Sequence, residues 1–160
     1  MTVNPEGGEP TPEAQLRSYI DRLDPRIQKL VRSVRTALRR RFPTANELAY
    51  DYGRSLVIGY SPTDNGIDAV VAIAARATGV SLYFNQGPQL PDPTGILLGS
   101  GRQTRFIQVE AASRLADPDV EALLAAAIDQ ATIPLPLEGK GRLVIKPPAA
   151  KKRPRRRPTK

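Results

Sequence analysis

Histidine and cysteine are both absent from this chain of 160 residues. Without cysteine there is no disulfide framework and no thiolate metal site. Without histidine there is no Ser-His-Asp or Cys-His triad, and no imidazole is available to bind a transition metal. Any metal would need oxygen ligands, but the acidic residues are scattered or lie at expected helix starts. We therefore expect no metal site and no cofactor.

Long apolar runs are also lacking, and none approaches the length of a membrane span. Residues 1–11 are polar and contain Glu, Gly and Pro, without the basic start and apolar stretch of a signal peptide. We expect a disordered lead-in there. The absence of cysteine agrees with a reducing compartment, so the expected location is cytoplasmic, with no membrane partner.

Acidic residues are too few to balance the basic ones, and the formal net charge is +8. The excess is local, because the last ten residues carry seven basic side chains and no acid: Lys151, Lys152, Arg153, Arg155, Arg156, Arg157 and Lys160. The rest of the chain has 17 basic and 16 acidic side chains. We therefore expect one ordinary domain over residues 12–147 and a basic, proline-rich tail over residues 148–160.

Helix signals are clear at three places. A helix over residues 12–23 is predicted by an apolar stripe, with Thr11 as its N-cap and proline in its first turn. A second helix is predicted to follow the N-cap Asp24 and to end near Phe42, before a proline. A third helix is expected to open at Asp117.

Strand signals fill most of the space between these helices. Five segments have strand length: residues 47–52, 55–60, 69–75, 80–85 and 104–110. Residues 135–145 favour a short hairpin around Gly139 and Gly141, with its proline-containing first arm at an edge. The expected fold class is α+β, with two N-terminal helices, an antiparallel sheet of about five strands and a closing C-terminal helix. The helices should form one layer on one face of the sheet.

The run LPDPTGILLGSG, from Leu90 to Gly101, is followed by Arg105 and resembles a segment of the YdhG-like family of proteins. The order of the preceding elements and the run GKGRLVI at residues 139–145 are also similar, so the resemblance covers roughly residues 16–156. It implies a compact α+β fold with two helical layers beside an antiparallel sheet, and little about activity. Some members are labelled iron-binding or iron chaperones, which would need clustered carboxylates. The first helix has only Glu13 and Asp21, which weighs against that role here.

One glycine-rich loop has the composition of an anion site, comprising Gly99, Ser100, Gly101, Arg102 and Arg105. Glycines let backbone N–H groups converge on an anion, and the arginines add positive charge. The loop lacks the Lys-Ser/Thr ending of a P-loop and precedes a strand. These departures favour the alternative, a glycine turn before an edge strand, in which Gly101 is the expected position of a positive φ.

A second candidate is a pocket of tyrosines, Tyr50, Tyr52 and Tyr60, on two neighbouring predicted strands. Proton transfer by such groups is chemically possible. Tyrosines on strands usually serve packing instead, and both interpretations stay open.

Two basic surfaces are candidates for contact with a polyanion. The second helix places Lys29, Arg32, Arg39 and Arg40 opposite its apolar stripe, and the tail adds the seven cations given above. The alternatives are a solvated helix face and a solubilising tail. The tail contains no aromatic residue, so it is suited to phosphate contact and not to reading sequence.

The leading hypothesis is a non-enzymatic, YdhG-like cytosolic domain that binds a small ligand or a protein, with weak polyanion affinity through its tail. The alternative is an accessory nucleic-acid-binding protein whose tail and second helix contact phosphates without sequence preference. An enzyme with a Tyr, Arg or Ser site is the third and least favoured class.

Overall fold

A computed structural model describes residues 10–147 of the chain. Residues 1–9 of the expected lead-in, and all of the expected tail at residues 148–160, lie outside the described part. Within the described residues, no helix combines the length and apolar character that a membrane crossing requires.

Two capped helices open the described chain. In α1, Pro12–Asp21, the Thr11 Oγ1 accepts a hydrogen bond from the Ala14 N–H at 3.1 Å, which confirms the predicted N-cap. In α2, Pro25–Arg41, the Asp24 carboxylate accepts from the Arg26 N–H at 3.0 Å, as predicted. α1 ends two residues earlier than expected.

A six-stranded sheet follows, with the strand order β5-β4-β3-β2-β1-β6. Its first five strands form the predicted antiparallel meander, with bounds within two residues of those expected. They are β1 Asn46–Asp51, β2 Ser55–Ser61, β3 Val71–Arg76, β4 Gly79–Phe84 and β5 Arg105–Val109. The mixed α+β class is therefore confirmed.

The prediction of a hairpin over residues 135–145 is wrong. Only Leu143–Lys146 forms a strand, β6, and it pairs in parallel with β1, so the sheet has six strands and a strand follows the last helix. Gly141 does not serve a hairpin turn. It packs against the backbone at Ala45, where a Cβ on Gly141 would lie 1.7 Å from the Ala45 carbonyl oxygen. This close approach lets the chain reach the free edge of β1.

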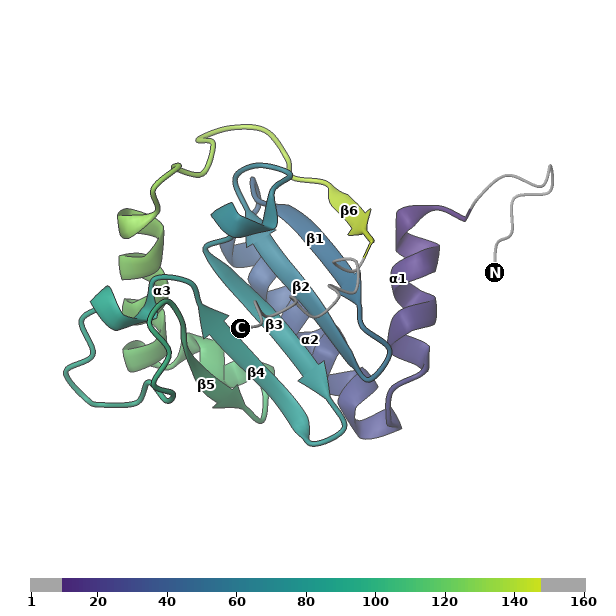
Figure 1. The fold of residues 1–160 in the computed structure, drawn as a ribbon, viewed down its shortest axis with the longest axis horizontal. Helices are drawn as coiled ribbons and strands as arrows, with labels where there is room; N and C mark the ends of the chain where they lie inside the picture. Colours follow the sequence, from purple (N-terminus) through teal and green to yellow (C-terminus); the bar gives the residue numbers. More distant parts are fainter. Residues whose placement is uncertain (1–9, 148–160) are drawn as a thin grey trace, which may run out of the picture.

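The helices lie on one side of the sheet, as Figure 1 shows by viewing the strands from the other side. α2 runs behind the strands, α1 lies beside β6, and α3, Pro118–Gln130, stands beside β4 and β5. Short 3₁₀ turns occupy the connections: η1 Gly66–Asp68, η2 Gly87–Gln89 and η3 Ala112–Ala116. The predicted single layer of helices on one face agrees with this arrangement.

Alternation along each strand separates two faces of the sheet. On β2, Leu56, Ile58 and Tyr60 join the core beneath the helices, whereas Val57 and Gly59 point to the other side. The same alternation continues on β3, β4 and β5. No described α-helix covers the second face, which we call the open face. The segment from Gly66 to Ala69 packs on part of it, where a Cβ on Gly59 would lie 3.4 Å from the Ala69 Cβ.

Candidate functional site

A pocket of about 550 Å³ lies at one end of the sheet, and we call it the end pocket. Four separate segments build it: η1 with the residues that lead into β3, the turn after β4, the loop before β5, and the last turn of α3 with the residues that follow. Its volume falls in the range of small-molecule sites, roughly 300–1,000 Å³.

Carboxamides dominate the polar part of its wall, and apolar groups complete it. The amide-bearing residues are Asn85, Gln86, Gln89, Gln103 and Gln130. Val70, Leu90 and Ala127 supply buried apolar surface. Such a wall orients a polar ligand through hydrogen bonds and contacts its carbon skeleton at the same time.

Several of these amides are fixed by contacts between the segments. The Asn85 Nδ2 donates to the Ala69 carbonyl oxygen at 2.5 Å, and the Gln86 Nε2 donates to the Thr132 Oγ1 at 3.2 Å. The wall on this side of the pocket is therefore preorganised.

Gln130 is the exception, because only half of its amide is used. Its Nε2 donates to the Gln89 carbonyl oxygen at 3.2 Å. Its Oε1 is buried and has no hydrogen-bond partner within the described chain. An unsatisfied buried acceptor costs roughly 1–3 kcal/mol, so a donor supplied at this wall would be stabilising.

Two opposite charges line the same pocket. Arg102 is exposed at its wall, and Asp68 is half-buried with its Oδ2 accepting from the Thr63 hydroxyl at 2.8 Å. The last turn of α3 also faces the pocket, and the carbonyl end of a helix favours donors and cations. The wall is thus suited to a molecule that carries both hydrogen-bond donors and an acidic group.

The predicted anion loop contributes only one residue to this pocket, Arg102. Arg105 donates instead to the carbonyl oxygens of Gly101 and Thr104. The expectation of a positive φ at Gly101 is wrong, since Gly99 has it, with φ 103°. The backbone of Gly99 packs on the Phe106 ring, beside a bridge between Leu98 and Phe106. This arrangement agrees with the alternative interpretation, a glycine turn beside the strand β5.

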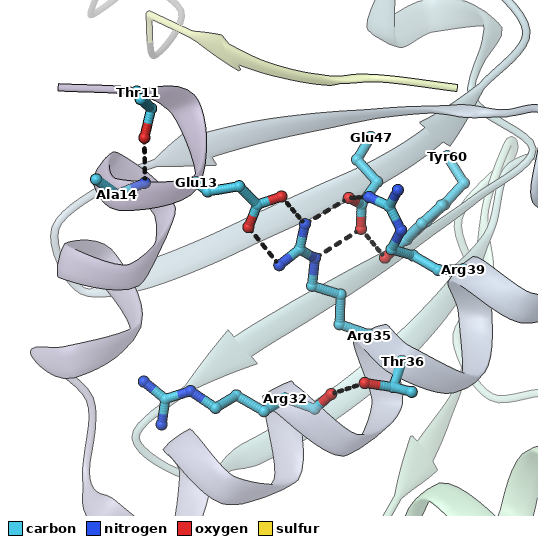
Figure 2. Close-up of polar contacts among 9 residues, drawn as sticks. All are labelled: Thr11, Glu13, Ala14, Arg32, Arg35, Thr36, Arg39, Glu47 and Tyr60. Atoms are coloured by element: carbon cyan, nitrogen blue, oxygen red, sulfur yellow. Dashed lines mark hydrogen bonds and ion pairs between the residues drawn. The ribbon is translucent and has the colours of Figure 1, made fainter. Parts of the chain in front are cut away.

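A buried charge cluster forms the second polar feature, and Figure 2 shows it between the helices and the sheet. Glu47 on β1 is 1% exposed. Arg35 of α2 donates to its two carboxylate oxygens at 2.8 and 2.7 Å, and the Tyr60 hydroxyl donates at 2.7 Å. Arg39 also pairs with Glu47, and Arg35 continues to Glu13 of α1 at 2.9 Å. We call these five side chains the Glu47 cluster.

The charges of this cluster fix its protonation states. Burial alone would raise the pKa of Glu47, but the hydrogen bond and charge of Arg35 outweigh burial and lower that pKa below 4.5. The hydrogen bond to Glu47 raises the pKa of Arg35, and burial raises that of Tyr60 well above 10. Both carboxylate oxygens of Glu47 already accept hydrogen bonds, so the buried carboxylate is not free to act as a base or a nucleophile. Its arrangement is that of a structural connection between α1, α2 and the sheet.

The structure does not gather the three candidate tyrosines. Tyr60 lies beneath the helices in the Glu47 cluster. Tyr50 pairs with Val57 on the open face, and its ring stacks on Tyr52 with centroids 6.1 Å apart. Burial and the neighbouring Tyr52 raise the pKa of Tyr50.

The predicted basic face of α2 is partly used within the protein. Arg32 pairs with Asp21 at 2.9 Å, and Arg39 reaches Glu47, so it does not lie opposite the apolar stripe as expected. Lys29 and Arg40 are exposed, and no ion pair is recorded for either among the described residues. The tail residues Lys151, Lys152, Arg153, Arg155, Arg156 and Arg157 lie outside the described part.

Sequence reasoning missed both the end pocket and the Glu47 cluster. The cluster had a usable signal: Glu47 shares strand alternation with buried Ala49, and Arg35 continues the apolar series of Ile27 and Val31. The pocket had none, because its walls come from four distant segments. Among residues 10–147, no three carboxylates are gathered in a way that would hold a metal ion.

Comparison of the chain with models of protein families, with curated proteins and with solved structures gives no significant match. The resemblance to the YdhG-like family therefore stays a prediction.

Proposed function

We propose that this domain is a binding protein, not an enzyme, and that its end pocket takes a small polar molecule. The observation that carries the proposal is the buried, unpartnered Gln130 Oε1 at the wall of a pocket of about 550 Å³. A ligand N–H or O–H would satisfy that acceptor once the Gln130 amide turns into the pocket, and Arg102 would hold an acidic group of the same ligand. Free amino acids and small hydroxy acids have this chemistry.

The type of residue in the wall supports binding without catalysis. Carboxamides orient a ligand but do not exchange protons near neutral pH, and no nucleophile paired with a base lines the pocket among the described residues. The YdhG-like affiliation and a cytoplasmic location remain part of this proposal.

Native mass spectrometry of the purified chain, followed by thermal-shift measurements with free amino acids and small hydroxy acids, tests the proposal. Arg102→Gln should weaken binding of an acidic ligand about tenfold or more, because a charged hydrogen bond is lost. Gln130→Leu should abolish the ligand-induced shift. It removes the unsatisfied acceptor but also the hydrogen bond from the Gln130 Nε2 to the Gln89 carbonyl oxygen, so the unfolding free energy of the free protein should change by less than about 1 kcal/mol.

Arg26→Gln is the matched control, an exposed arginine at the start of α2 that does not line the pocket. It should leave binding unchanged. The proposal fails if no compound in the panel shifts the melting temperature and no small molecule is retained. It also fails if Gln130→Leu binds as well as the unaltered chain.

A second candidate function is nonspecific binding of nucleic acid through the tail. The seven cations among the last ten residues favour it. The proposed share of α2 is smaller than expected, because Arg32 and Arg39 are engaged in ion pairs.

A further inference from the structure

Three amide oxygens in the wall of the end pocket have no donor within the described chain. The Asn85 Nδ2 and the Gln130 Nε2 donate to the carbonyl oxygens of Ala69 and Gln89. A carbonyl oxygen only accepts, so these contacts fix the orientation of both amides and leave their oxygens as acceptors. No described group donates to the Asn85 Oδ1, the Gln86 Oε1 or the Gln130 Oε1. The pocket therefore favours a ligand with several N–H donors.

Two opposite charges of the same pocket are not paired with each other. Asp68 comes from η1, and Arg102 comes from the loop before β5. Among residues 10–147, neither forms an ion pair with the other or with a third residue. The Asp68 Oδ2 accepts from the Thr63 hydroxyl at 2.8 Å, and no described group donates to its Oδ1. A molecule with an ammonium group and a carboxylate would satisfy both charges.

Apolar side chains lie both at the bottom of the pocket and at its exposed wall. Val70, Leu90 and Ala127 are buried. Ile67 and Ile133 are 78% and 40% exposed, although both are large and apolar. They come from η1 and from the residues after α3, which are two of the four segments that build the pocket. Contact with these surfaces would stabilise a ligand that carries apolar side chains.

The size of the pocket favours several linked residues over one. Its volume of about 550 Å³ lies in the range of drug-sized ligands, roughly 300–1,000 Å³, and a free amino acid is smaller than that class. Each residue added to an amino acid brings one peptide N–H and one carbonyl oxygen. A carboxamide can donate to that oxygen or accept from that N–H. The side chains of Gln89 and Gln103 are suited to this, because neither makes a hydrogen bond to another described residue.

We propose that the end pocket binds a dipeptide or tripeptide with free ends, whose carboxylate pairs with Arg102 and whose ammonium group pairs with Asp68. The amides of the wall hold the peptide bonds, and apolar side chains of the ligand lie against the apolar part of the wall. Capture of a terminal carboxylate or amine is a recurring mode of peptide recognition. This inference rests on the proposed function, because it names the class of small polar molecule that the pocket takes.

Isothermal titration calorimetry with the full chain tests the proposal. The probes are leucine, leucyl-leucine and alanyl-alanine, and the tighter dipeptide is also used acetylated at its N-terminus or amidated at its C-terminus. At least one free dipeptide should bind about tenfold more tightly than leucine. Acetylation and amidation should each weaken binding about tenfold or more, because each removes a charged hydrogen bond.

Two variants match the ends of the peptide with the residues that bind them. Asp68→Asn keeps an acceptor for Thr63 and should weaken binding of the free dipeptide about tenfold, without affecting the acetylated one. Arg102→Gln should weaken binding of the free dipeptide without affecting the amidated one. Asp129→Asn is the matched control, because Asp129 is an exposed carboxylate beside Gln130 that does not line the pocket. It should bind every probe like the unaltered chain, and circular dichroism checks that all variants are folded.

The outcomes separate this inference from the proposed function. If leucine binds as tightly as both dipeptides, the pocket takes a single amino acid, so the inference fails while the proposed function stands. Equal affinity for the free, acetylated and amidated dipeptides would show that the ends are not bound, and would also overturn the inference. An equal loss in Asp68→Asn and Asp129→Asn would overturn the contact with the ammonium group. If no dipeptide, amino acid or hydroxy acid binds, both proposals fail.

Discussion

Glu47→Gln is the sharpest test of the energetics inferred for this fold. The substitution keeps the shape of the side chain and an acceptor for Tyr60, but removes the charge that Arg35 and Arg39 face. Removing one partner of a buried ion pair costs about 3–5 kcal/mol, because the other charge stays buried and unpaired. Arg35 keeps its contact to Glu13 and is 17% exposed, so we expect a loss of about 3 kcal/mol in the free energy of unfolding.

Glu13→Gln provides the matched control. Its carboxylate contacts the same arginine, but its side chain is 56% exposed. An exposed ion pair contributes less than about 1 kcal/mol. The two glutamates therefore share Arg35 as a partner and receive the same substitution. They differ in burial and in number of partners, because Glu47 also accepts from Arg39 and Tyr60.

Urea denaturation followed by far-UV circular dichroism measures the difference, since the chain has no tryptophan for fluorescence. A loss of about 3 kcal/mol corresponds to a fall in melting temperature of roughly 10 °C for a domain of this size. If the free energies of unfolding of the Glu47→Gln and Glu13→Gln proteins agree within 1 kcal/mol, the reasoning about burial is refuted.

Three further predictions concern single side chains and pH. The pKa of Glu47 is lowered on folding, so its ionisation stabilises the native state above about pH 4.5, and this contribution is lost as the pH falls through the folded pKa. Between pH 7 and pH 3, the urea midpoint of the Glu47→Gln protein should therefore fall less steeply than that of the unaltered chain. Tyr60→Phe should cost about 1.5–3 kcal/mol by urea denaturation, through loss of a hydrogen bond to a charged group. Gly99→Ala should lower the unfolding free energy by about 1–3 kcal/mol, because φ is 103° there, whereas Gly101→Ala should change it by less than about 0.5 kcal/mol. Equal losses in the two variants would contradict the assignment of the positive φ to Gly99.

Most of the helices and strands could be predicted from local signals in the sequence. Asp24 followed by proline fixed the start of α2, because the cap and the missing proline N–H are satisfied within a few residues. The meander was predictable for the same reason, since each strand pairs with its neighbour in sequence.

Features that depend on distant residues were not predictable in this way. β6 pairs with a strand nearly a hundred residues earlier, where the Glu47 N–H donates to the Arg142 carbonyl oxygen at 2.9 Å. A four-residue strand has too little pattern to show which edge it joins. Tyr50 and Tyr60 were expected together, but Glu47 pairs with Tyr60 and Tyr50 with Val57, which places the two tyrosines on opposite faces.

Alternation along β1 makes a last prediction possible, because the two faces of this strand contribute unequally to stability. Odd-numbered Glu47 points to the helices, and even-numbered Tyr50 points to the open face, followed by Tyr52. Glu47→Gln should therefore lower the unfolding free energy. Tyr52→Leu should change it by less than about 1 kcal/mol, since its side chain is 47% exposed and makes little use of the core. Urea denaturation of both variants decides the point. If Tyr52→Leu costs as much as Glu47→Gln, the assignment of unequal roles to the two faces is wrong.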